Sequence, residues 1–163
     1  MAAIFCDLAD AITTELAARL ADSSFGAAYA AIVPDRSYAD WEDTLESMGT
    51  LQVDVVPVEH EIAELETHGS VKYQIPVDIG IRQRFGRGDN GRVAKASVDA
   101  LVLLLENIFE HFAALELSGM SSHDCNWFET KIRQTFNREH LREHGQYTGI
   151  IRTTYRISKE ETL

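Results

Sequence analysis

Residues 71–85 read Val-Lys-Tyr-Gln-Ile-Pro-Val-Asp-Ile-Gly-Ile-Arg-Gln-Arg-Phe, and this stretch decides the fold of the chain. Apolar side chains at every second position from Val71 to Ile81 alternate with polar ones such as Asp78 and Arg82. A period of two predicts a β-strand with one buried face. At about 3.3 Å per residue the strand would reach roughly 45–50 Å, far beyond the usual five or six residues. We therefore expect a strand that overruns its own domain and projects a tip.

The tip follows at residues 82–92, which are rich in glycine and arginine. Its arginines form the densest basic cluster in the chain. Such a cluster is either a solvated loop end or a surface that docks on an acidic region of a partner or of the next subunit. The candidate docking residues are Arg82, Arg84, Arg87 and Arg92.

The same tip contains the string G-x-G-x-x-G at residues 86–91, between the long strand and a helical stretch. Glycines there allow a close approach of the backbone to a phosphate. However, the preceding strand alternates instead of being apolar on both faces, and no parallel strand-helix-strand unit with a closing acidic residue follows. We therefore predict no cofactor-binding residue, and a nucleotide-dependent cytosolic enzyme that uses this loop stays an alternative.

The composition is that of one globular domain spanning residues 1–163, because 45% of the residues are hydrophobic and 25% are charged. No apolar run approaches the roughly 20 residues of a membrane span, and no secretory signal is apparent. The two cysteines, Cys6 and Cys125, do not form a C-x-x-C pair. We expect a soluble intracellular protein with no disulfide framework.

The net charge of −11 is unevenly distributed along the chain. Residues 1–69 carry a net charge of −12, and residues 70–163 carry +1. The first part is either a solvated acidic face or a surface that meets a basic region on a neighbouring copy. Sequence-independent binding of nucleic acid is disfavoured, because it requires clustered lysine and arginine.

The hydrophobic periodicity predicts an α+β fold. Two long helices are expected at residues 3–21 and 93–117, where apolar side chains recur at helical spacing. We expect a mostly antiparallel sheet of about five strands, with both helices on one face and a long protruding strand or hairpin. Strands are expected at residues 28–33, 51–58, 71–85, 126–136 and 147–157, a short acidic helix at 40–48, a loop at 59–69 and a polar link or single helical turn at 137–145.

No group of residues forms a convincing catalytic or metal site. His140 and His144 lie four residues apart, but the sequence nominates no further ligand, so we interpret them as solvated helix residues. Cys125 lies near His123 without an orienting partner, and we interpret it as a core residue that leads into a strand. We therefore predict no enzyme activity, no catalytic residue and no metal.

The order of the elements and their patterns of apolar and polar residues resemble a known family over most of residues 4–157. The stretches that carry the resemblance are LQVDVVPVEHE, VKYQIPVDIGIRQRF, VDALVLLLENIFEHF and YTGIIRTTYRIS. They are similar to the tail terminator, or tail completion, proteins of long-tailed bacteriophages, and to nearby neck and head–tail joining proteins. The resemblance implies a small α+β subunit of a hexameric ring that caps the tail tube, ends its polymerisation and presents a surface to the head.

The resemblance further implies the partners and the location of the protein. The partners would be other copies of the chain, the tail tube protein and head–tail connector proteins, with DNA passing through the lumen without specific binding. The location would be the tail–neck junction of the virion, after assembly in the host cytoplasm. A head-side connector or another neck protein is the main alternative, and a dimeric small-molecule-binding domain is a third.

Overall fold

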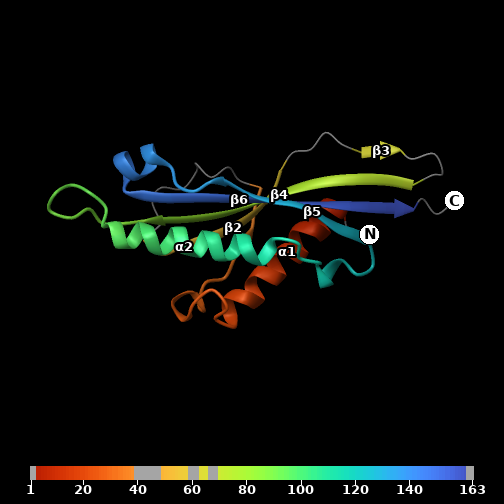
Figure 1. The fold of residues 1–163 in the computed structure, drawn as a ribbon, viewed down its shortest axis with the longest axis horizontal. Coiled ribbons are helices and arrows are strands. Elements are labelled where there is room, and N and C mark those ends of the chain that lie inside the picture. Colours follow the sequence, from red (N-terminus) through yellow and green to blue (C-terminus); the bar gives the residue numbers. More distant parts are fainter. Residues whose placement is uncertain (1–2, 39–48, 59–62, 66–69, 161–163) are drawn as a thin grey trace.

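A computed structural model of the chain describes residues 3–38, 49–58, 63–65 and 70–160. The α+β architecture is the predicted one: two main helices, α1 (Ile4–Ala21) and α2 (Lys95–Phe112), pack on a mostly antiparallel sheet (Figure 1). Five strands follow the order β1-β2-β4-β6-β5, and β3 pairs with β4 beside this path. The strands are β1 (Asp35–Arg36), β2 (Gln52–Pro57), β3 (Ala63–Leu65), β4 (Ser70–Arg84), β5 (Asp124–Gln134) and β6 (Gln146–Glu160).

The long strand exists, but it does not project alone. All 15 residues of β4 pair with the 15 residues of β6, from Ser70 opposite Glu160 to Arg84 opposite Gln146. The two strands form an antiparallel ribbon that runs along the whole molecule (Figure 1). The part that extends beyond the ribbon and beyond α2 is the loop that follows Arg84. The predicted protruding feature is therefore this loop at the end of a paired ribbon.

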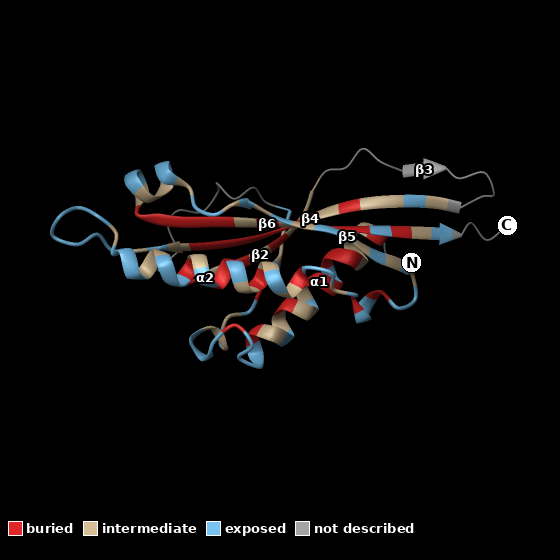
Figure 2. Cartoon of the chain, viewed as in Figure 1, coloured by how far each residue is buried: buried red, intermediate tan, exposed pale blue. Residues whose placement is uncertain are grey.

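The core lies between the helices and one face of the sheet (Figure 2). Four successive residues on the helix-facing side of β4, Ile75, Val77, Ile79 and Ile81, are fully buried, as the alternation predicts. Both helices contribute stripes at three- and four-residue spacing. The buried stripe residues are Ile4, Leu8, Ile12, Leu16 and Leu20 of α1, and Leu101, Leu104, Leu105, Ile108 and Phe112 of α2.

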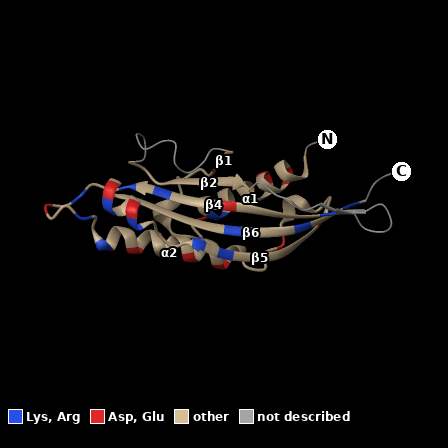
Figure 3. Cartoon of the chain, turned by 90° about the horizontal axis from the view of Figure 1, so that it is seen from above, with Lys and Arg blue, Asp and Glu red and all other residues tan. Residues whose placement is uncertain are grey.

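The opposite face of the sheet carries charged residues along its strands (Figure 3), and two of its ion pairs are largely buried. The Asp78 carboxylate accepts two hydrogen bonds from Arg152, at 2.8 Å and 3.0 Å. Arg82 donates to Asp54 on β2 at 2.7 Å. Asp78 is 6% exposed and Arg82 is 7% exposed. At these two pairs, ion pairing across neighbouring strands thus replaces the hydration that the sequence pattern suggested.

Two of the predicted elements differ most from the structure. The strand expected at residues 28–33 is wrong: a short 3₁₀-helix, η1 (Ala27–Tyr29), precedes Pro34, and the strand β1 begins after that proline. The second long helix ends at Phe112 instead of residue 117. Hydroxyl groups from the sheet donate to carbonyl oxygens at and beyond this end, Thr130 to Phe112 and Tyr155 to Leu115. These hydrogen bonds satisfy carbonyl oxygens that would otherwise be bonded within a longer helix.

The remaining predictions are confirmed in outline or fall outside the described residues. The predicted strand at 126–136 is β5, which begins two residues earlier and contains two register shifts against β6. The predicted loop at 59–69 contains the short strand β3, and its other residues lie outside the described part, as does the predicted helix at 40–48. The polar link between β5 and β6 contains η3 (His140–His144), a single turn of π-helix, and η2 (Ser118–Met120) precedes β5.

Replacement of Gly145 by alanine is expected to lower the free energy of unfolding by about 1–2 kcal/mol, because a left-handed backbone disfavours a Cβ atom. Gly145 has φ of 61°, and a Cβ there would lie 2.9 Å from the Phe85 carbonyl oxygen. Urea unfolding measures the change. The control is Gly86→Ala, whose Cβ meets no atom within 4 Å. Equal stability of the two variants would contradict this account of the turn.

Candidate functional site

The structure removes Arg82 from the predicted docking residues. Its guanidinium group lies against Asp54 at 2.7 Å, and only 8% of its side chain is exposed. A residue in this position holds β4 to β2 and offers no charge to a partner. The sequence pattern places Arg82 on the outer face of the sheet, but pairing with a strand 28 positions earlier is a tertiary property.

The other three predicted docking residues, Arg84, Arg87 and Arg92, are exposed at the far end of the ribbon. Two of them are anchored to the main chain around η3. Arg84 Nε donates to the His144 carbonyl oxygen at 3.2 Å, and Arg87 Nη2 donates to the Arg142 carbonyl oxygen at 2.7 Å. Carbonyl groups near the end of a helical turn attract cations. Arg84 and Arg87 therefore hold the loop and η3 together, and both residues are also exposed to solvent.

The loop itself is shaped by local hydrogen bonds. The Gly88 amide donates to the Arg92 carbonyl at 2.9 Å, and the Gly91 amide donates to the Gly88 carbonyl at 2.8 Å. The Asn90 side chain accepts a hydrogen bond from the Arg92 amide at 3.0 Å. Gly91 has φ of 70°, a conformation that favours glycine. These hydrogen bonds fold residues 88–92 into a compact turn, and Arg92 is exposed on it.

The glycine string does not have the surroundings of a dinucleotide site. The strand before it, β4, runs antiparallel to β2, β3 and β6. In a dinucleotide fold the glycines permit close backbone and helix packing within a parallel unit. Here a Cβ atom added at Gly86 or Gly91 would meet nothing within 4 Å. The loop therefore follows an antiparallel strand instead of standing in the parallel unit of a dinucleotide fold.

Two arginines that sequence reasoning did not select join this end of the molecule. Arg138 and Arg142 lie at η3, four residues apart, and line a pocket with Arg92. We call Arg84, Arg87, Arg92, Arg138 and Arg142 the arginine end. The chain separates Arg92 from Arg138 by a helix and a strand, so no local pattern joins them. The four-residue spacing of Arg138 and Arg142 was the only signal available in the sequence.

The pocket at the arginine end has a volume of about 300 Å³ and an apolar floor. Val98 and Leu141 on this floor pack against the main core. Three arginines are among its lining residues, so the pocket suits a ligand that carries both an apolar group and negative charge. We call it the arginine pocket, and it is lined by Gly91, Arg92, Val93, Val98, Arg138, Leu141 and Arg142.

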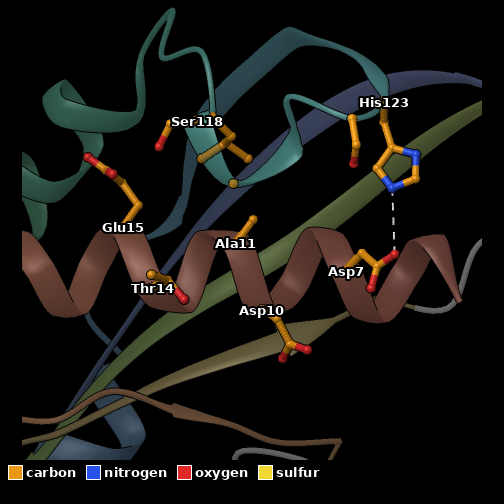
Figure 4. A pocket seen from close by; sticks show the side chains of 10 residues that line it. Asp7, Asp10, Ala11, Thr14, Glu15, Ser118 and His123 are labelled. Atoms are coloured by element: carbon orange, nitrogen blue, oxygen red, sulfur yellow. Dashed lines mark ion pairs between the residues drawn. The ribbon is translucent and has the colours of Figure 1, made fainter. Parts of the chain in front are cut away.

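A second groove, of about 450 Å³, lies on the other side of the fold between α1 and the η2 connection (Figure 4). Its acidic side chains make two contacts with histidines. His123 Nε2 lies 3.6 Å from Asp7 Oδ2, and His111 Nε2 lies 3.0 Å from Glu15 Oε1. These pairs tie α1 to both ends of the segment between α2 and β5. The groove is thus acidic and internally paired. Its lining residues include Asp7, Asp10, Thr14, Glu15, Ser118, Ser122 and His123.

The residues considered for catalysis or metal binding do not come together. His140 and His144 have their ring centroids 6.3 Å apart, and within the described residues no third ligand joins them in a metal-binding group. Burial raises the pKa of the Cys125 thiol to about 11, with Glu116 and Asp124 adding to the effect. A thiol with so high a pKa stays protonated at neutral pH, and it is a poor nucleophile.

No protein-family model matches the chain, and no curated protein matches it. The described residues include no helix with the length and apolarity required to cross a bilayer. The site must therefore be interpreted from its own chemistry. Its main features are one arginine-rich end and an acidic groove elsewhere on the same subunit.

Proposed function

We propose that this chain is a structural subunit of a ring, of the type formed by the tail terminator proteins of long-tailed bacteriophages. In this role it caps the tail tube, ends tube polymerisation and provides the surface for head–tail joining. The resemblance of the chain to those proteins supports the proposal, as does the shared α+β layout. A hexamer, with the tail tube protein and the head–tail connector proteins as partners, belongs to the same proposal.

The observation that carries the proposal is the separation of unlike charged surfaces on one subunit. The loop after β4 and the η3 segment, which carry the arginine end, lie at one tip of the elongated fold (Figure 1). The acidic groove is lined by residues of α1 and of the η2 connection. A ring requires heterologous contacts, in which one surface of a subunit meets a different surface of the next. Opposite charges on those surfaces favour the head-to-tail arrangement and oppose a symmetric pairing of like with like.

A negatively charged subunit also suits a lumen through which DNA passes. The net charge of −11 repels the phosphate backbone, so DNA would slide through without specific binding. A head-side connector would share these properties, and the chain's partner distinguishes the two roles. Binding to a tail tube end supports the terminator, whereas binding only to a portal complex supports the connector. Either role places the protein at the tail–neck junction of the virion.

The test of the proposal is the mass of the assembled protein by analytical ultracentrifugation, alone and with tail tubes. We expect a closed oligomer whose association weakens at least about tenfold in Arg92→Glu, because charge reversal removes an attractive contact. Arg92 is the better probe than Arg84 or Arg87, which also hold η3. The control is Lys131→Glu on β5, at a side chain that is 52% exposed.

Two outcomes would contradict the proposal. The first is a protein that stays monomeric at all concentrations, both alone and with tail tubes. The second is an equal effect of Arg92→Glu and Lys131→Glu, which would mean that association responds to net charge and not to the arginine end. Tube lengths measured by electron microscopy give an independent result, because a terminator stops tube growth.

A further inference from the structure

The arginine pocket holds like charges around an apolar floor. In the described part of the chain, the Arg92 and Arg138 guanidinium groups have no ion-pair partner. Among the described residues, the Arg142 side chain pairs only with Glu143, at 3.4 Å, and both of these side chains are largely exposed. Three cations that face one cavity repel each other, and a partner that brings carboxylates relieves this repulsion. The pocket is therefore arranged to receive negative charge.

The apolar floor narrows the chemistry of the occupant. A small inorganic anion would leave Val98 and Leu141 in contact with water, whereas a side chain inserted between the arginines would cover them. A nucleic acid is disfavoured because the whole chain carries a charge of −11. An acidic peptide segment with bulky apolar side chains meets both requirements, since arginine pairs with carboxylates and also packs on aromatic rings.

The chain itself contains such a segment. Residues 39–48 lie outside the described part of the chain and read Ala-Asp-Trp-Glu-Asp-Thr-Leu-Glu-Ser-Met. The segment has four acidic residues, no basic residue, and an aromatic and an aliphatic side chain at Trp41 and Leu45. Tryptophan is among the residues that most often anchor interfaces. Of the two acidic stretches in residues 39–69, only this one contains an aromatic side chain.

We infer that the arginine pocket is a receptor for residues 39–48 of a second copy of this chain. The inference rests on the proposed ring and assigns the arginine pocket to this segment of the next copy, in place of the acidic groove: Trp41 or Leu45 covers the apolar floor, and the neighbouring carboxylates meet the arginine rim. One copy provides the pocket and the next provides the segment. This contact is heterologous, so it extends from subunit to subunit until the ring closes.

The first experiment measures binding of a peptide with the sequence of residues 39–48, labelled with a fluorophore. The full-length protein used is Asp43→Lys with Glu46→Lys, in which the competing natural segment is weakened and the pocket is intact. We expect saturable binding that weakens at least about tenfold when Arg138→Glu is added, and that is unchanged by Lys131→Glu. Absence of binding, or equal effects of both substitutions, would overturn the inference.

The second experiment asks whether the contact is between copies. Arg138→Glu with Arg142→Glu disables the pocket, and Asp43→Lys with Glu46→Lys disables the segment. Each variant alone is expected to be monomeric, with an unchanged circular dichroism spectrum. An equimolar mixture is expected to give heterodimers, because one intact pocket can still bind one intact segment. Failure of the mixture to associate would overturn the inference and leave other ring contacts possible.

The two experiments separate this inference from the proposed function. If the wild-type protein forms rings but the peptide does not bind, the ring stands and the pocket contact is wrong. If the peptide binds and the variants form heterodimers, but no ring forms with or without tail tubes, the contact stands and the proposed function fails.

Discussion

Replacement of Leu104 by alanine is expected to lower the free energy of unfolding by about 3 kcal/mol, whereas the same replacement at Leu103 changes it by less than about 0.5 kcal/mol. The two residues are neighbours on α2, with the same side chain and the same helix propensity. Leu104 is 1% exposed and Leu103 is 57% exposed. The difference between the variants therefore measures burial against the sheet and excludes any effect on the helix itself.

The physical reason is the cavity that a shortened side chain leaves between α2 and the long strands. Leu104 belongs to the same core as Ile79 of β4 and Ile151 of β6, so atoms on both layers lose contacts. The loss of stability is smaller where neighbouring side chains can move into the cavity. Urea unfolding gives both values, and the slope of the transition should be the same in both variants. Equal destabilisation by the two substitutions would contradict the burial of Leu104 and the exposure of Leu103.

The helix and strand positions of this core were predictable from the sequence because they depend on local periodicity. The stripe on α2 recurs every three or four residues, and β4 alternates every two, so each buried face follows from its own element. Four of the five predicted strands, and the packing of both helices on one face, followed from the same patterns. Once each buried face was known, the packing of the helices on the sheet could be predicted from these faces alone.

Features that depend on register between distant segments were not predictable. The length of β6 is set by its pairing with β4, and the two register shifts in β5 appear only against β6. The arginine end also depends on contacts between distant segments. Arg92 lines the same pocket as Arg138 and Arg142, although a helix and a strand separate these residues in the chain. The sequence identified three of its five arginines, because those three lie close together in the chain, at the end of β4 and in the loop that follows it.

Replacement of Asp78 by asparagine is expected to lower the free energy of unfolding by about 3 kcal/mol, because it leaves a partly buried arginine without its counter-charge. Asp78 accepts both hydrogen bonds of Arg152, whose side chain is 21% exposed, and Arg133 lies 4.0 Å away on the other side. The carboxylate thereby links β4 to β6 and to β5 on the face opposite the helices. The control is Glu129→Gln, which removes an exposed ion pair with Lys131 and should change stability by less than about 0.5 kcal/mol.

A double-mutant cycle separates the ion pair from the simple loss of a side chain. Arg152→Met in the Asp78→Asn background removes the charge that asparagine leaves behind, so the double variant should be more stable than Asp78→Asn alone. The effect of Asp78→Asn should also persist at high salt, since buried pairs are screened much less than exposed ones. A change below about 1 kcal/mol that disappears with added salt would instead mean that water reaches Asp78, and that the outer face of the sheet is as solvated as its sequence pattern suggests.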